Sequence, residues 1–163
     1  MKMPPEIVTI GAYGWDAVRF FAALAEARAD TFCDLRARRG VRGHEYAWAN
    51  SQRLQAALME RGIRYLHFPE LAPSEAARAA QAAADKAAGV AKRKRTALGA
   101  AFVEAYRQEQ LAAFDAFAFL AALGDAHVVA LFCVEGDPAA CHRSLLAARL
   151  ADDLGRPVLH LLP

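Results

Sequence analysis

The sequence predicts a single three-layer α/β/α domain whose mostly parallel sheet of about five strands is Rossmann- or flavodoxin-like. Two observations predict this class. Short β-type runs alternate with helical patterns along the chain, which favours a parallel sheet covered by helices on both faces. One run, His127–Phe132, is continuous and apolar, as expected of a strand buried on both faces. The 163 residues suit one domain, taken as residues 1–163.

The first elements along the chain are two strands around a helix. Ile7–Ile10 is a β-type run that Gly11 closes. Apolar residues at helical spacing predict a helix over about Trp15–Arg28. Thr31–Leu35 predicts the second strand, and an Arg- and Gly-rich loop over residues 36–43 follows it.

A helix and a third strand come next. Asn50 and Ser51 are both good N-caps, and Gly62 is a good helix end, so a helix is expected between them. Ile63–Phe68 then predicts a strand.

The segment 76–99 differs in composition from the rest of the chain. It is dominated by alanine and has few large apolar side chains, so we expect a helical or partly mobile insertion that contributes little to the core. Its basic run Lys92–Arg95 is interpreted as a solvated helix face, with contact to a nucleic-acid backbone as the alternative.

The last third of the chain completes the alternation. A helical pattern extends over Phe102–Leu120, and the apolar strand His127–Phe132 follows it. Asp137–Pro138 is a typical helix start and Gly155 a typical helix end, with a last strand over Pro157–Leu161.

Composition excludes several classes of protein. With 56% hydrophobic residues and a net charge of +2, the chain is unlike a disordered protein. No apolar run reaches the roughly 18–20 residues that a membrane helix needs, so no membrane partner is expected. Its three cysteines are no disulfide framework and there is no secretory apolar segment near the start, so we expect a cytoplasmic protein.

Basic residues gather in two parts of the sequence. Residues 35–64 and residues 86–107 each carry a net charge of +5, which leaves −8 for the rest of the chain. Such islands indicate either directional attraction of an anion or separate solvated faces.

Polar side chains follow several of the predicted strands. Gly11 ends the first strand, Asp34 and Arg36 end the second, and Cys133 and Glu135 follow the apolar strand. Because ligands of parallel α/β sheets gather at the carboxyl ends of the strands, we expect these residues to form a site.

The stretch Cys133–Ser144 carries the strongest chemical signal. Backbone N–H groups at the predicted helix start attract anions, and Arg143 and Ser144 would add side-chain donors to such a ligand. A thiol at a helix start beside His142 is a candidate nucleophile, which makes Cys141 a nucleophile or a polar wall. The alternative is that the two thiols only pack and that Glu135 and Arg143 form a structural ion pair.

A metal site is a second interpretation of the same residues. Cys133, Cys141 and His142, with His160, offer thiolate and imidazole ligands. Their spacing is not a common zinc pattern, and adjacent side chains point apart on a helix. The sequence therefore predicts neither a metal nor a cofactor.

The loop after the second strand is the other candidate. Arg36 and Arg42 suit phosphate and carboxylate groups, and nearby glycines would let the loop approach a ligand closely. The alternative is that Asp34 pairs locally and the arginines face solvent.

Four stretches together resemble the domain-of-unknown-function family 488. They are Thr9–Gly11, Asp34–Arg36 with its basic loop, Gly62–Tyr65, and Cys133-x-Glu135 with Cys141–Arg143. The chain has Ala12-Tyr13 where many members have a His-Ser pair after the first glycine. The resemblance implies a compact three-layer domain and a polar site built from Asp34, Arg36, Glu135, Cys141, His142 and Arg143, and it implies no reaction.

These observations lead to two functional hypotheses. The first is an enzyme-like domain with a site for an anion, such as a phosphate, nucleotide or nucleic acid, at the carboxyl ends of the strands. Arg36 and Arg143 would hold the anion, Gly11 and Arg42 would line the site, and Glu135 or His142 would transfer protons. The second is a non-catalytic nucleic-acid-binding module that uses the two basic islands.

Overall fold

The computed structural model describes residues 2–163, so only Met1 of the expected domain lies outside it. The strands are β1 (Glu6–Ile10), β2 (Thr31–Asp34), β3 (Arg64–His67), β4 (Val128–Phe132) and β5 (Val158–His160). The α-helices are α1 (Ala17–Glu26), α2 (Ser51–Glu60), α3 (Glu75–Ala88), α4 (Ala100–Tyr106), α5 (Ala116–Leu123) and α6 (His142–Leu154). Shorter turns are the 3₁₀ helices η1 (His44–Ala49), η2 (Pro69–Leu71), η3 (Lys92–Lys94) and η5 (Pro138–Ala140), and the π-helical turn η4 (Arg107–Leu111).

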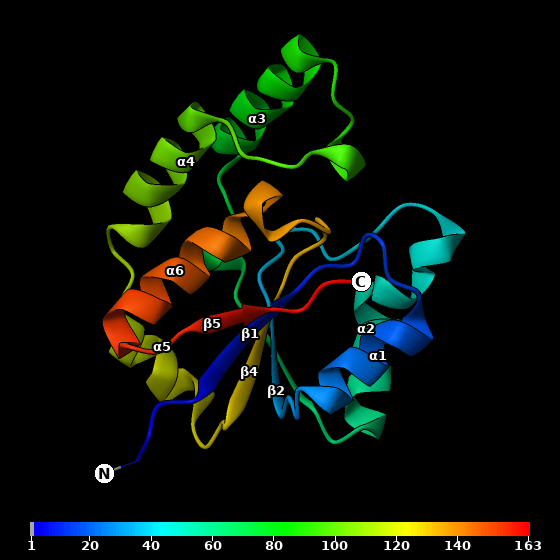
Figure 1. Ribbon diagram of the computed structural model, residues 1–163, viewed down its shortest axis with the longest axis vertical. Coiled ribbons are helices and arrows are strands. Elements are labelled where there is room, and N and C mark those ends of the chain that lie inside the picture. Colours follow the sequence, from blue (N-terminus) through cyan, green and yellow to red (C-terminus); the bar gives the residue numbers. More distant parts are fainter. Residues whose placement is uncertain (1) are drawn as a thin grey trace.

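The five strands form one parallel sheet in the order β3-β2-β4-β1-β5. Helices cover both of its faces, which confirms the three-layer α/β class (Figure 1). All five residues of the central strand β4 are buried, as its continuous apolar sequence predicted.

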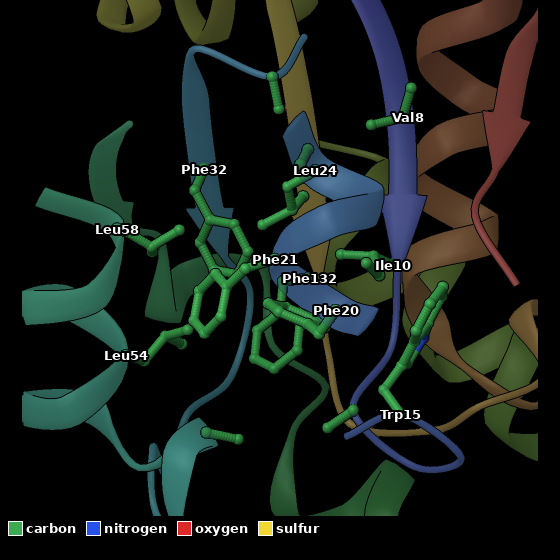
Figure 2. Close-up of a cluster of buried hydrophobic side chains, with 14 of the residues drawn as sticks. Val8, Ile10, Trp15, Phe20, Phe21, Leu24, Phe32, Leu54, Leu58 and Phe132 are labelled. Carbon is green, nitrogen blue, oxygen red and sulfur yellow. The ribbon is translucent and has the colours of Figure 1, made fainter. Parts of the chain in front are cut away.

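Successive residues of each strand point to opposite faces and build two cores. Val8 and Ile10 of β1 face α1 and α2, where Phe20 packs against Phe32 and Phe132 (Figure 2). The opposite face packs under α4, α5 and α6, with buried residues that include Ile7, Cys33, Leu131, Phe119 and Leu146.

Two helix boundaries differ from the sequence expectation, and the later start of α6 leaves Cys141 outside the helix. The Asp137 carboxylate accepts a hydrogen bond from the N–H of Ala139, but the helix that it caps is only the 3₁₀ turn η5. The chain then becomes extended at Cys141, and α6 begins at His142 instead of Asp137. The single helical stretch expected over residues 102–120 is divided into α4, η4 and α5, because Asp115 caps a new helix.

The segment 75–99 stands beyond the carboxyl ends of the strands. Within it, α3 runs out from the sheet and packs along α4, and the chain returns through η3 (Figure 1). Only Ala77 and Gln81 of this segment are buried. Within residues 2–163, the helices are too short or too polar to cross a bilayer.

Candidate functional site

A cavity of about 590 Å³ opens at the carboxyl ends of β2 and β4. The loops after these strands, the start of α6, and the segment that holds α3 and η3 all line it. Its size lies within the range of about 300–1,000 Å³ typical of small-molecule sites. The residues that we expected to gather at this edge of the sheet therefore surround a space that admits a ligand.

Asp34 organises the loop after β2. Its carboxylate is fully buried and accepts hydrogen bonds from Nε and Nη2 of Arg36 at 2.9 and 2.8 Å. The Tyr65 hydroxyl donates to the same carboxylate at 2.6 Å. Arg36 also donates from Nη1 to the carbonyl of Ala49 at 2.9 Å. Arg36 lines the cavity and Asp34 does not, so Asp34 positions the guanidinium.

Gly11 brings the end of β1 against the loop after β4. A Cβ at this position would lie 2.0 Å from the carbonyl oxygen of Glu135, so only glycine permits the approach. The N–H groups of Ala12 and Tyr13 both donate to the carbonyl of Val134, at 3.0 and 2.9 Å. Gly11 thus fixes the loop that carries Glu135 and does not itself line the cavity.

Arg143 holds the same loop from the other side. It is completely buried and donates from Nη1 to the carbonyl of Glu135 and from Nη2 to that of Gly136 at 3.2 Å. Its Nε lies 3.4 Å from the Thr9 hydroxyl. It does not line the cavity, so it supports the loop where we had expected it to hold an anion. Arg143 bonds the main-chain carbonyl of Glu135, whereas the carboxylate of Glu135 pairs with Arg95.

The floor of the cavity is made of two thiols and an imidazole. Cys133 follows β4, Cys141 immediately precedes α6, and His142 is the first residue of that helix. All three are buried, and their ligand atoms lie within 4.8 Å of one another. Cys141 is extended, with φ −136° and ψ 142°, and its thiol lies within 4.8 Å of the ligand atoms of both Cys133 and His142. The premise that Cys141 and His142 diverge on a helix is therefore wrong.

The floor has a distinct charge pattern. Burial opposes ionisation of Cys141, but a hydrogen bond from Cys133 and the positive charges of His142 and Arg143 outweigh it, so the pKa of this thiol lies well below its ordinary value. The hydrogen bond to Cys141, with burial, raises the pKa of Cys133. Burial lowers the pKa of His142, but the Cys141 thiolate and Glu135 raise it to above its ordinary value. Of the two thiols, Cys141 is therefore the one that ionises more readily.

Glu135 is a buried carboxylate at the cavity wall. Its Oε1 accepts a hydrogen bond from Nη2 of Arg95 at 3.0 Å, and Nζ of Lys92 lies 4.0 Å away. Its Oε2 is buried and has no hydrogen-bond partner among residues 2–163. Burial, followed by the Cys141 thiolate, raises its pKa. Such a carboxyl group, with one anchored oxygen and one free oxygen, suits proton transfer.

Basic side chains surround the cavity. Those that line it are Arg36, Arg38, Arg42, Arg78, Lys92, Arg93 and Arg95, against only Asp85 and Glu135 as acidic residues. The two islands of the sequence meet here, because Nη2 of Arg93 donates to the carbonyl of Arg42 at 2.7 Å. The same guanidinium lies over the rings of Tyr13 and Tyr46, at 5.0 and 5.2 Å from their centroids.

The expected site residues divide into two groups. Arg36, Arg42, Glu135, Cys141 and His142 line the cavity. The others lie behind it and hold neighbouring groups: Asp34, Gly11, Arg143 and Ser144, whose hydroxyl donates to the carbonyl of Cys141 at 2.9 Å. The ring of His160 lies apart from the thiol cluster and pairs with the Thr9 hydroxyl at 2.7 Å.

Sequence reasoning missed the part of the site that comes from segment 75–99. Within the run Lys92–Arg95, the first three residues form the exposed turn η3, as expected of a solvated face, whereas the side chain of Arg95 is 9% exposed and lies between Asp85 at 2.7 Å and Glu135 at 3.0 Å. Arg78 of α3 also lines the cavity. The excess of positive charge in this segment was the one available signal, and it did not show that the segment returns to the strand ends.

Comparison with known proteins supports the assignment made from the motifs. A search of curated proteins and a search of solved structures gave no match to the chain. A family model described as "Domain of unknown function DUF488" matches residues 16–150, which include the loop after β2 and the whole stretch from Cys133 to Ser144. The chain therefore belongs to the family of domain of unknown function DUF488.

Proposed function

We propose that this protein is an enzyme that binds a phosphate-bearing small molecule in the cavity at the carboxyl ends of β2 and β4. One observation carries the proposal: seven basic side chains converge on a cavity whose lining also holds a buried carboxyl group and two buried thiols. Anionic groups of the ligand would contact the rim, and its reacting end would lie over Glu135 and Cys141.

The basic side chains of the rim are not equally available to a ligand. Arg36 is paired with Asp34, and Arg95 with Asp85 and Glu135. Arg38, Arg42 and Arg78 have no ion-pair partner within residues 2–163. Guanidinium groups bind phosphate oxygens in a bidentate manner, so these three arginines are the proposed phosphate donors.

Glu135 is the proposed proton-transfer group. Its pKa is raised toward pH 7, which suits a group that both accepts and donates a proton. Its Oε2 has no partner within residues 2–163 and would bond a ligand hydroxyl or a water molecule. Lys92 and Arg95 hold the other oxygen and fix the orientation of the group.

A thermal-shift screen tests the binding step. The panel comprises inorganic phosphate, pyrophosphate, sugar phosphates and nucleoside phosphates, each paired with its phosphate-free counterpart where one exists. A ligand at 100 times its Kd stabilises the folded state by about 2.7 kcal/mol. For a chain of this size that corresponds to a rise in Tm of about 5–11 °C. A shift only with the phosphate-bearing member of a pair supports the proposal, and no shift across the panel contradicts it.

A second candidate is a non-catalytic nucleic-acid-binding module. The observation that favours it is the aromatic and cationic group at the cavity mouth, where Tyr13 and Tyr46 lie 5.2 Å apart under Arg93. Nucleobases stack on such side chains in single-strand-binding proteins. Fluorescence anisotropy with a labelled single-stranded oligonucleotide tests it, with a steep loss of affinity as salt increases as the expected result.

A further inference from the structure

We propose that Cys133, Cys141 and His142 bind a thiophilic divalent cation at the floor of the cavity, with Zn²⁺ as the best-fitting ion. Their ligand atoms all lie within 4.8 Å of one another, and all three side chains are buried. Two thiolates and an imidazole are a ligand set that Zn²⁺ takes in proteins, and two thiolate charges balance those of the ion. The inference rests on the proposed function, because the ion would lie beneath the phosphate-bearing ligand.

The spacing of the ligand atoms suits a tetrahedral ion. The Sγ of Cys141 lies 3.9 Å from Nδ1 of His142. With a Zn–S distance of about 2.3 Å and a Zn–N distance of about 2.0–2.1 Å, two ligands of a tetrahedral ion stand roughly 3.6 Å apart. A movement of a few tenths of an ångström would bring these two atoms onto the ion.

The imidazole of His142 is already oriented as a ligand. Its Nε2 lies 3.3 Å from the carbonyl oxygen of Leu35, so a proton on Nε2 is donated to the main chain. Nδ1 faces Cys141, and on loss of its proton it would be the ring atom that binds the ion. Histidines that bind metals almost always donate their other ring N–H to a carbonyl or carboxylate. Tyr106 packs against the ring at 5.4 Å and helps to fix it.

The fourth coordination position would face the cavity. Cys133, Cys141 and His142 all line it, as does Glu135. Three protein ligands with one open position are typical of catalytic zinc sites, whereas structural sites use four. Glu135 lines the cavity, and its buried Oε2 has no partner among residues 2–163, so a water molecule on the ion would supply the donor that this oxygen lacks. That acceptor is an observation independent of the thiol cluster.

Titration of chelator-treated protein with Co²⁺ tests the site. We expect one equivalent of Co²⁺ to produce the d–d bands of a tetrahedral ion and a thiolate charge-transfer band, and Zn²⁺ to abolish both. The wild-type spectrum needs no variant, so the test stands even where a variant fails to fold. Binding of less than about 0.1 equivalent, or a spectrum without the thiolate band, overturns the proposal.

Substitutions then assign the ligands. Cys133→Ser and Cys141→Ser should each remove about half of the charge-transfer intensity. Loss of a group that only hydrogen-bonds a metal ligand weakens binding by roughly 10–100-fold, so His142→Asn, which removes a ligand itself, should weaken Zn²⁺ binding at least as much. Cys33→Ala is the matched control, because Cys33 is a buried thiol on β2 outside the cluster and should leave one equivalent bound. Equal loss of binding in the Cys33→Ala protein would contradict the assignment.

The same chelator-treated protein separates this proposal from the proposed function. A phosphate-dependent rise in Tm without a Co²⁺ spectrum would overturn the metal site and keep the ligand site, with Cys141 as a nucleophile. A Co²⁺ spectrum in a protein that no phosphate-bearing compound stabilises would keep the metal site and overturn the proposed ligand.

Discussion

Replacing Gly11 with alanine perturbs the contact that places Glu135 and Cys133 at the cavity. The added Cβ would lie 2.0 Å from the carbonyl oxygen of Glu135 and 2.9 Å from its carbonyl carbon. Ordinary contact begins at 3.4 Å, so the strand end and the loop must separate by about 1.4 Å. Both contacting atoms belong to the main chain, and therefore no rotation of a side chain can relieve the overlap.

The stability cost follows from that separation. Overpacking of a well-packed site costs typically about 1–3 kcal/mol. The movement also strains the two hydrogen bonds that the carbonyl of Val134 accepts from Ala12 and Tyr13, each worth about 1 kcal/mol. We expect a loss of about 3 kcal/mol, which for 163 residues lowers Tm by about 6–12 °C.

Thermal and urea denaturation followed by circular dichroism measure the effect. Gly40→Ala is the matched control, since Gly40 lies at the cavity but an added Cβ there would meet only the Asn50 side chain, at 3.7 Å. That change should leave stability within about 1 kcal/mol of wild type. A Gly11→Ala protein that unfolds within 1 °C of wild type would refute the role assigned to this contact.

Three other predictions concern the groups around the cavity. Asp34→Asn should destabilise the protein by about 3–5 kcal/mol in urea denaturation, because it leaves the Arg36 guanidinium buried without its carboxylate; Tyr65→Phe, which removes one hydrogen bond to Asp34, should cost only about 0.5–1.5 kcal/mol. Arg95→Gln should speed tryptic cleavage within segment 89–99, because Arg95 ties that segment to α3 and to the loop after β4; an unchanged cleavage rate would argue against this tie. Ser144→Ala should preserve any phosphate-dependent rise in Tm, since its hydroxyl bonds the carbonyl of Cys141 and does not line the cavity.

The sequence was most informative where the chemistry depends on strand direction. All parallel strands end at the same edge of a sheet, so polar residues placed after them must gather. Strand direction therefore predicts that Arg36, Glu135 and Cys141 lie together, and all three line one cavity in the structure. The alternating pattern of strands and helices was sufficient for the three-layer fold because it is set by local periodicity.

The features that the sequence did not predict depend on contacts between residues far apart in the chain or on local alternatives of similar energy. An arginine beside a helix start is equally compatible with a free anion ligand and with the buried anchor that Arg143 proves to be. The start of α6 was misplaced because Asp137 caps a short 3₁₀ turn as readily as an α-helix. The return of segment 89–99 to the strand ends depends on the pairing of Arg95 with Glu135, which lies 40 residues away along the chain.

The central claim is that the rim arginines of the cavity bind phosphate groups. The most direct test is calorimetric titration with whichever phosphate-bearing compound gives the largest rise in Tm. The double variant Arg42→Gln/Arg78→Gln removes two arginines of the rim, and Arg53→Gln/Arg107→Gln removes the same charge from exposed positions outside the cavity. Two charge-assisted hydrogen bonds at about 1.5 kcal/mol each correspond to a roughly 100-fold difference in Kd. We predict one binding site per chain, a loss of about that size in the rim variant and a Kd within about threefold of wild type in the control. Equal affinity for the wild type and the rim variant would contradict the claim.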